Sequence, residues 1–214
     1  YTTEQDLQLS TYASAEAQAA AIADDIAYDA HDIDDGMRAG LLTVEGLREV
    51  DFLREILDAI EAQHPGLEKP RLVNEVVRRV ITRMIEDVIA ESLRRLEETR
   101  PGSADALRHA GRPMIAFSTG LVAADKAIKM HLWHHVYRHP RVMQVMTAAE
   151  GVVQRLFERY WNDPDALPPE WRTRLDPADT DRRARRISDF LAGMTDRYAL
   201  REHQRLFDAS PDLG

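Results

Sequence analysis

Apolar side chains recur at intervals of three and four residues along most of the chain, which is the spacing of an amphipathic helix. The first such run follows Ser14, a residue type that caps helix N-termini, and continues to Met37. Prolines and glycines separate the later runs. Those runs predict helices over about 43–64, 71–100, 121–137, 141–161 and 182–207. The sequence lacks the alternation typical of a strand, so the pattern predicts an all-α fold.

The helical pattern extends through the chain without a sequence repeat or a low-complexity tract. The sequence therefore predicts a single all-α region over 1–214. Its main interruption is the stretch 162–181, where prolines favour a surface excursion over a continuous helix. These prolines are Pro164, Pro168, Pro169 and Pro177.

Composition and charge narrow the function classes. The net charge is −9, and the first 37 residues contain nine acids and no Lys or Arg. A nucleic-acid partner is not expected, because phosphate binding needs clustered cations. No apolar run is long enough to cross a bilayer, so we expect no membrane partner. The absence of cysteine excludes thiolate chemistry and suits a cytoplasmic location. Because the chain begins with Tyr1, we expect it to be part of a longer protein.

The polar face of the first predicted helix carries the strongest chemical signal. Asp24, Tyr28 and Asp32 follow one another at intervals of four residues, and Asp35 continues the same stripe. Two carboxylates and a phenol in line can hold a divalent metal and a polar ligand. The alternative interpretation is a solvated acidic helix face, and periodicity alone leaves both open.

Several segments match a known family. They are EAQ at 16–18, ADDIAY at 23–28, HDIDDG at 31–36, RAG at 38–40, VYRHP at 136–140 and GMTDRYAL at 193–200. In this order they resemble the bacterial deoxyguanosinetriphosphate triphosphohydrolase-like proteins of the HD superfamily. The resemblance covers nearly the whole chain. It implies an all-α fold and hydrolysis of a deoxynucleoside triphosphate to the deoxynucleoside and inorganic triphosphate.

The resemblance also implies roles for five residues. Asp24 matches a metal ligand, and the expected ion is Mg²⁺ or Mn²⁺, with a transition metal as a further option. Tyr28 matches a tyrosine that approaches the substrate, and Asp32 matches an aspartate near the sugar hydroxyl. Lys129 falls near a residue that contacts phosphates. Tyr137 falls near a tyrosine that packs against the deoxyribose, where its ring would reject a ribose 2′-hydroxyl.

The chain departs from the family pattern upstream of Asp24. The family has a first histidine ligand and a His-Asp pair before that aspartate, and both are missing here. His31-Asp32 looks like the pair but follows Asp24, so we expect His31 not to be a ligand. The chain resembles the C-terminal portion of the enzyme. It should carry no catalytic residue of its own, and alone it should hold the metal weakly or not at all.

Two further expectations complete the sequence-based picture. His131 and His135 have a metal-compatible spacing, but no acid lies within that turn, so a metal role is not expected. The expected partners are a deoxynucleoside triphosphate and further copies of the same chain. The alternative to an enzyme is a non-catalytic helical module that serves oligomerisation or regulation.

Overall fold

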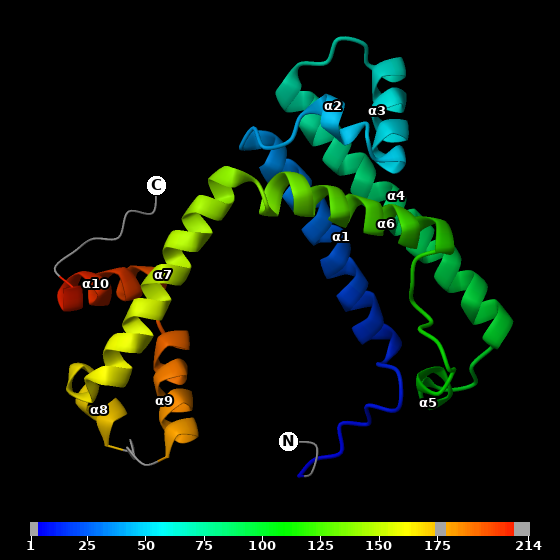
Figure 1. The fold of residues 1–214 in the computed structure, drawn as a ribbon. Helices are drawn as coiled ribbons and strands as arrows, with labels where there is room; N and C mark the ends of the chain where they lie inside the picture. Colours follow the sequence, from blue (N-terminus) through cyan, green and yellow to red (C-terminus); the bar gives the residue numbers. More distant parts are fainter. Residues whose placement is uncertain (1–3, 174–178, 208–214) are drawn as a thin grey trace. The chain divides into compact units, whose positions relative to one another are not determined.

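A computed structural model describes residues 4–173 and 179–207. Within these ranges every regular element is a helix, which confirms the all-α prediction (Figure 1). The chain divides into two compact units, Tyr1–Tyr137 and Arg138–Gly214, where the sequence predicts a single region. Each unit has its own hydrophobic core. In the described part of the chain, no helix is long and apolar enough to cross a membrane.

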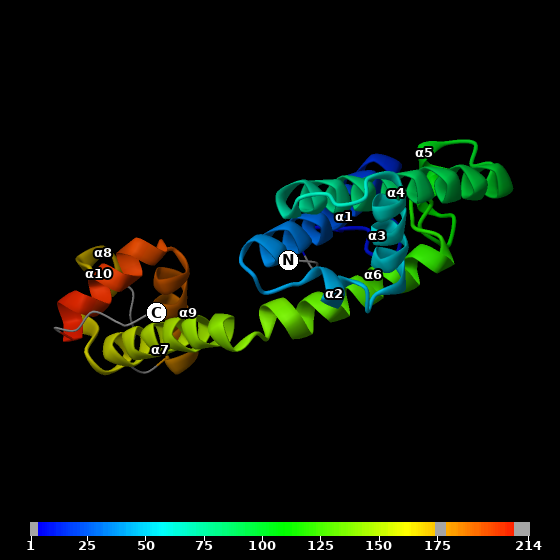
Figure 2. The same ribbon diagram turned by 90° about the horizontal axis from the view of Figure 1, so that it is seen from above.

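The first unit is organised around α1, Ala15–Arg38. The Ser14 side chain accepts a hydrogen bond from the backbone N–H of Ala17 and so caps the helix, as its sequence position predicts. α1 lies between α4 (Lys69–Thr99) and α6 (Thr119–Leu132), and the second view shows this layering (Figure 2). The acidic stripe of α1 is therefore carried on a helix that two neighbours hold in place.

The helix predicted over 43–64 is two helices, α2 (Val44–Leu47) and α3 (Asp51–Gln63). The prediction of one continuous helix was wrong because Val50 takes an extended backbone conformation, with φ −95° and ψ 115°. The bend buries both Leu47 and Val50 and turns α3 onto α4. Burying each such side chain contributes about 1.5–3 kcal/mol, which outweighs the few hydrogen bonds that an unbroken helix would add.

The rest of the first unit consists of α4, the short α5 (Ala104–Arg108), α6 and a π-helical turn, η1 (Trp133–Tyr137), that directly follows α6. The Ser118 side chain caps α6 and is itself held by Asp87 of α4 through its backbone N–H and its hydroxyl. Ser118 thus links the start of α6 to α4, and this link sets the position of α6 and η1 relative to α4.

The second unit packs around buried side chains of α7 and α9, and α10 adds partly buried hydrophobic residues to this core. The helix predicted over 182–207 is interrupted, because Gly193 ends one helix and the Thr195 side chain accepts from the N–H of Tyr198 at the start of the next. Within the predicted excursion 162–181, Leu167 is buried in this core, and residues 174–178 lie outside the described residues. The helices of this unit are α7 (Pro140–Asn162), η2 (Pro164–Ala166), α8 (Pro169–Arg172), α9 (Thr180–Ala192) and α10 (Asp196–Phe207).

Candidate functional site

The predicted stripe lies on the accessible side of α1. Asp24 is exposed, and Tyr28 has 58% of its surface accessible, while Asp32 is half-buried. The opposite face of the helix supplies Ile26 and Ile33 to the core. The stripe is therefore available to a ligand or to another protein segment.

Asp32 contacts Tyr137, the predicted site residue that lies farthest from it in the sequence. The Tyr137 hydroxyl donates a hydrogen bond to the Asp32 carboxylate. The π-helical turn brings Tyr137 onto the partly buried rim of the first core. Burial, followed by the nearby charge of Asp35, raises the pKa of Asp32, and His31 opposes this shift. Two side chains that the sequence-based prediction assigns to one site are thus in direct contact in the structure.

Gly36 permits the close approach of α1 to η1. A Cβ atom at this position would lie 2.7 Å from the Leu42 Cδ1 atom and 3.1 Å from the Val136 Cγ2 atom. Both distances are shorter than ordinary packing contacts. A larger residue would therefore push away both η1, which carries Val136, and the turn after α1, which carries Leu42. The glycine in the HDIDDG segment therefore has a structural role beside Tyr137.

Lys129 lies beside α1 and is already paired. Its ammonium group is 2.9 Å from an oxygen of Asp125 and 3.4 Å from an oxygen of Asp25. Burial opposes its charge, but the Asp125 hydrogen bond and the neighbouring carboxylates outweigh that effect and raise its pKa. Lys129 of α6 is thus a charged cation next to the acidic stripe, and its partner Asp25 directly follows Asp24 on α1.

Asp29 is a buried acid that the sequence-based prediction did not single out. It is fully buried, and neither of its carboxylate oxygens has a hydrogen-bond donor. Burial, together with the adjacent carboxyl of Asp125, raises the pKa of Asp29 to about 7, against a smaller opposing effect of Lys129. Asp29 is therefore partly protonated near neutral pH, close to the ion pairs of Lys129.

The described residues fit only part of a metal site at Asp24. One exposed carboxylate supplies a single hard oxygen ligand, whereas a divalent cation needs several ligands to be held against water. Asp25 is engaged with Lys129. In the part of the chain that the structure describes, no group of three neighbouring ligands includes Asp24. Among the described residues His31 does not complete such a group either, and its exclusion as a ligand stays a prediction.

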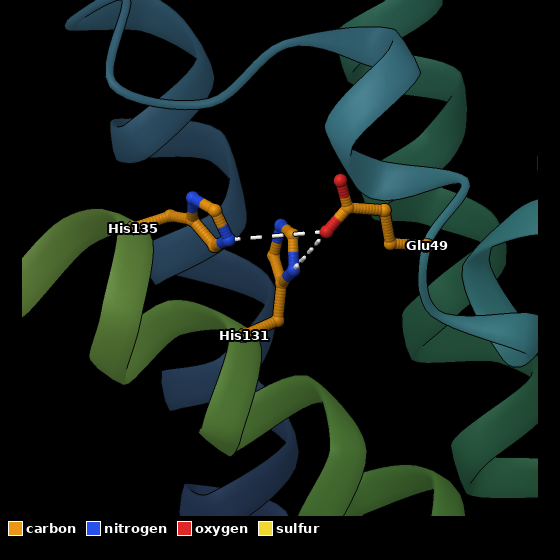
Figure 3. A group of neighbouring side chains, drawn as sticks. All are labelled: Glu49, His131 and His135. Atoms are coloured by element: carbon orange, nitrogen blue, oxygen red, sulfur yellow. Dashed lines mark ion pairs between the residues drawn. The ribbon is translucent and has the colours of Figure 1, made fainter.

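Sequence reasoning missed a different grouping. Glu49, in the bend between α2 and α3, faces His131 of α6 and His135 of η1 (Figure 3). The rings of the two histidines are 4.3 Å apart between centroids. Burial, followed by the charge of neighbouring His135, lowers the pKa of His131 and keeps it neutral at pH 7. No local signal links position 49 to this turn, because only the fold brings the carboxylate there.

Comparisons with known proteins agree with the resemblance seen in the sequence. The profile of the phosphohydrolase-associated domain matches residues 115–205. Deoxyguanosinetriphosphate triphosphohydrolase-like protein 1 of Mesorhizobium japonicum is 51% identical over 213 residues, which are 100% of this chain and 53% of that protein. The like-named protein of Rhodopseudomonas palustris (strain BisB5) is 53% identical over 97% of this chain and 52% of its own length. That of Brucella ovis is 50% identical, with the same coverage. The chain spans about half the length of these curated relatives.

Proposed function

Because the chain is homologous over its whole length to deoxyguanosinetriphosphate triphosphohydrolase-like proteins, we propose that it forms part of a metal-dependent hydrolase of deoxynucleoside triphosphates. The products are the deoxynucleoside and inorganic triphosphate. This chain supplies one metal ligand, Asp24, and part of the substrate pocket, namely Tyr28, Asp32, Lys129 and Tyr137. The remaining ligands come from a part of the enzyme outside this chain.

The hydrogen bond from Tyr137 to Asp32 is the observation that carries this proposal. The two residues match sugar contacts of the family, and they come from helices far apart in the sequence. A solvated acidic helix face has no need of such a contact. Their pairing gives a preorganised edge, on which one carboxylate oxygen is fixed and the tyrosine ring is oriented.

The sugar is recognised by shape and by one hydrogen bond. The Tyr137 hydroxyl donates its hydrogen bond to one Asp32 oxygen, and the other Asp32 oxygen accepts a hydrogen bond from a sugar hydroxyl. The ring of Tyr137 lies against the face of the deoxyribose, where a 2′-hydroxyl would collide with it. Tyr28 is exposed one turn before Asp32 and contacts the substrate from the same helix. Selection of deoxy over ribo substrates therefore depends mainly on the position of η1.

The triphosphate requires positive charge near the acidic stripe. Lys129 exchanges its long contact with Asp25 for a phosphate oxygen and keeps its shorter contact with Asp125. Asp24 would be one ligand of Mg²⁺ or Mn²⁺, and the bound ion would supply Lewis acidity toward the triphosphate and the attacking water. We further propose that the enzyme is cytoplasmic and assembles from several copies.

The test uses the whole protein that contains this chain. With Mg²⁺ or Mn²⁺ it should convert at least one deoxynucleoside triphosphate into deoxynucleoside and triphosphate, separated by ion-exchange chromatography. Asp24→Ala should remove bound metal and activity together. Glu86→Ala removes an exposed acid of α4 that lies outside the stripe, so it is the control and should retain both. Normal metal content and turnover in Asp24→Ala would exclude Asp24 as a ligand.

One observation favours the alternative of a non-catalytic helical module. An apolar groove of about 350 Å³ runs between α1 and α4, and Ile85 and Ile89 on its rim are exposed. If assembly were the only role, Ile89→Asp would change the oligomeric state measured by light scattering, and no deoxynucleoside triphosphate would be hydrolysed by the whole protein. Hydrolysis that is lost in Asp24→Ala would favour the enzyme over the non-catalytic helical module.

A further inference from the structure

Glu49, His131 and His135 converge from two separate segments of the first unit. An oxygen of Glu49 lies 3.8 Å from Nδ1 of His131 and 3.9 Å from Nε2 of His135. One ligand atom from each of the three side chains falls within 4.8 Å of the others. Two imidazoles and a carboxylate are a donor set typical of zinc and related ions.

His131 is the fixed member of the group. Only 8% of its surface is accessible, and its Nε2 atom has no hydrogen-bond partner. Its Nδ1 atom faces Glu49, but at 3.8 Å the separation is too long for a hydrogen bond. Nδ1 is therefore the atom that His131 presents to Glu49, and it makes no hydrogen bond in the described part of the chain.

The other two members can adjust. The Glu49 side chain is 64% accessible and that of His135 is 48% accessible, so both can rotate without disturbing the core. Ligand atoms around a tetrahedral ion with bonds of about 2.0–2.1 Å lie roughly 3.3 Å apart. The observed separations of 3.8 and 3.9 Å therefore need to close by about half an ångström, and a separation of up to 4.8 Å by about 1.5 Å, which rotamer changes of the two surface side chains supply.

The group lines a cavity of about 800 Å³, which also reaches His134 and Lys126. Three protein ligands beside an open volume leave a coordination position for water or for an exchangeable ligand. The η1 segment that carries His135 is a π-helical turn, a local geometry that recurs at functional positions in helices.

We propose that Glu49, His131 and His135 bind a divalent transition-metal ion, with Zn²⁺ as the best match, at a site separate from the Asp24 stripe. Imidazole donors disfavour Mg²⁺, which prefers oxygen ligands and retains its water. The ion ties the bend before α3 to η1, the same turn that carries Tyr137. The site does not depend on the proposed hydrolase activity, because none of its residues belongs to the predicted substrate pocket.

The test measures metal binding to the 214-residue chain itself, prepared without a histidine tag and stripped with a chelator. Titration with Zn²⁺ by calorimetry at pH 7.5 should give one ion per chain, and Co²⁺ should give the visible absorption of a four- or five-coordinate site. Mg²⁺ in large excess should not compete. Zn²⁺ should also raise the midpoint of thermal unfolding, because it binds only the folded arrangement.

Three variants assign the ligands. Glu49→Gln and His135→Gln alter exposed side chains and should each weaken Zn²⁺ binding by about tenfold or more, without changing the thermal midpoint of the metal-free protein. His134→Gln is the matched control, since it is an exposed histidine of the same cavity outside the ligand group, and it should bind as the unmodified chain does. Equal affinity in Glu49→Gln and His135→Gln, or the same loss in His134→Gln, overturns the assignment. Absence of stoichiometric Zn²⁺ binding overturns the site.

Discussion

The hydroxyl of Tyr137 donates to the carboxylate of Asp32 across the interface between η1 and α1. The contact joins the end of one segment to the middle of another, and Gly36 lets the two approach. Substrate recognition in the proposed enzyme therefore depends on the packing of two helices as much as on the chemistry of either side chain.

Loss of the Tyr137 hydroxyl should reduce catalytic efficiency without unfolding the protein. In the whole protein, we expect Tyr137→Phe to lower kcat/KM for the preferred deoxynucleoside triphosphate by about tenfold to a hundredfold, because a hydrogen bond to a charged group contributes about 1.5–3 kcal/mol. Tyr137→Ala should in addition narrow the ratio of kcat/KM values between deoxy and ribo substrates, because the ring is gone. Steady-state kinetics with matched nucleotide pairs measures both effects. An unchanged ratio in Tyr137→Ala would contradict the role of the ring.

The isolated 214-residue chain should release no triphosphate. Asp24 is its only residue matched to a ligand of the proposed catalytic metal, and one carboxylate cannot hold a divalent ion against water at useful affinity. A product assay with Mg²⁺ or Mn²⁺ should give the rate of the enzyme-free control, with the whole protein as the positive control. Turnover by the isolated chain would mean that it contains a complete site, and His31→Ala would then test whether His31 belongs to it.

Asp29 should make the stability of the first unit depend on pH. Its pKa is about 7 in the folded protein, against an ordinary value of 3.8, so the folded state binds more protons than the unfolded state between those two pH values. The free energy of unfolding should therefore fall as pH rises from about 4 to about 7, and this part of the dependence should level off above 7. The shift corresponds to about 2–4 kcal/mol.

Asp29→Asn should remove this part of the slope. The free energy of unfolding of the variant, minus that of the unmodified chain, should be more positive at pH 8 than at pH 5. Urea unfolding at both pH values measures this difference. Glu86→Gln, which changes an exposed acid of α4, should show no such gain. An identical stability difference at both pH values for Asp29→Asn would mean that Asp29 is ionised in the folded state.

The second unit should be sensitive to one buried hydroxyl. Tyr160 is fully buried, and its hydroxyl donates to a carboxylate oxygen of Glu202 at 2.9 Å. Tyr160→Phe should lower the free energy of unfolding by about 1–2 kcal/mol, because Glu202 keeps Arg205 but loses its buried donor. Tyr198→Phe, in which the ring stays half-buried, should change it by less than about 0.5 kcal/mol. Urea unfolding followed by tryptophan fluorescence distinguishes the two variants.

Local signals were sufficient wherever a helix boundary is made by its own residues. Ser14 caps α1 as expected, and the spacing of Asp24, Tyr28 and Asp32 predicted one common face. Local signals failed at Val50. The helical periodicity continues through this residue, but the burial of Leu47 and of one face of α3 favours a bend there. The break near Gly193 had a local signal, a glycine followed by a capping threonine, which the longer apolar period obscured.

The same distinction applies to the two candidate sites. Asp24, Tyr28 and Asp32 lie on one helix and can be grouped from spacing alone. Lys129 and Tyr137 were added by resemblance, and the ion pair with Asp25 and the hydrogen bond to Asp32 bring each of them to α1. Glu49 was missed because the bend that carries it is a tertiary feature, so the carboxylate near His131 has no signature in the sequence.

The π-helical turn at Trp133–Tyr137 has an evolutionary consequence. Such a turn holds one residue more than the α-helical turn it replaces, so it is the structural equivalent of a one-codon insertion. Deleting a single codon in η1 would restore α-helical winding, so the residues on either side of the turn would keep their places while those within it change face. In this fold, an insertion or deletion of one codon can therefore alter the proposed substrate pocket beside Asp32 while the buried core residues are retained.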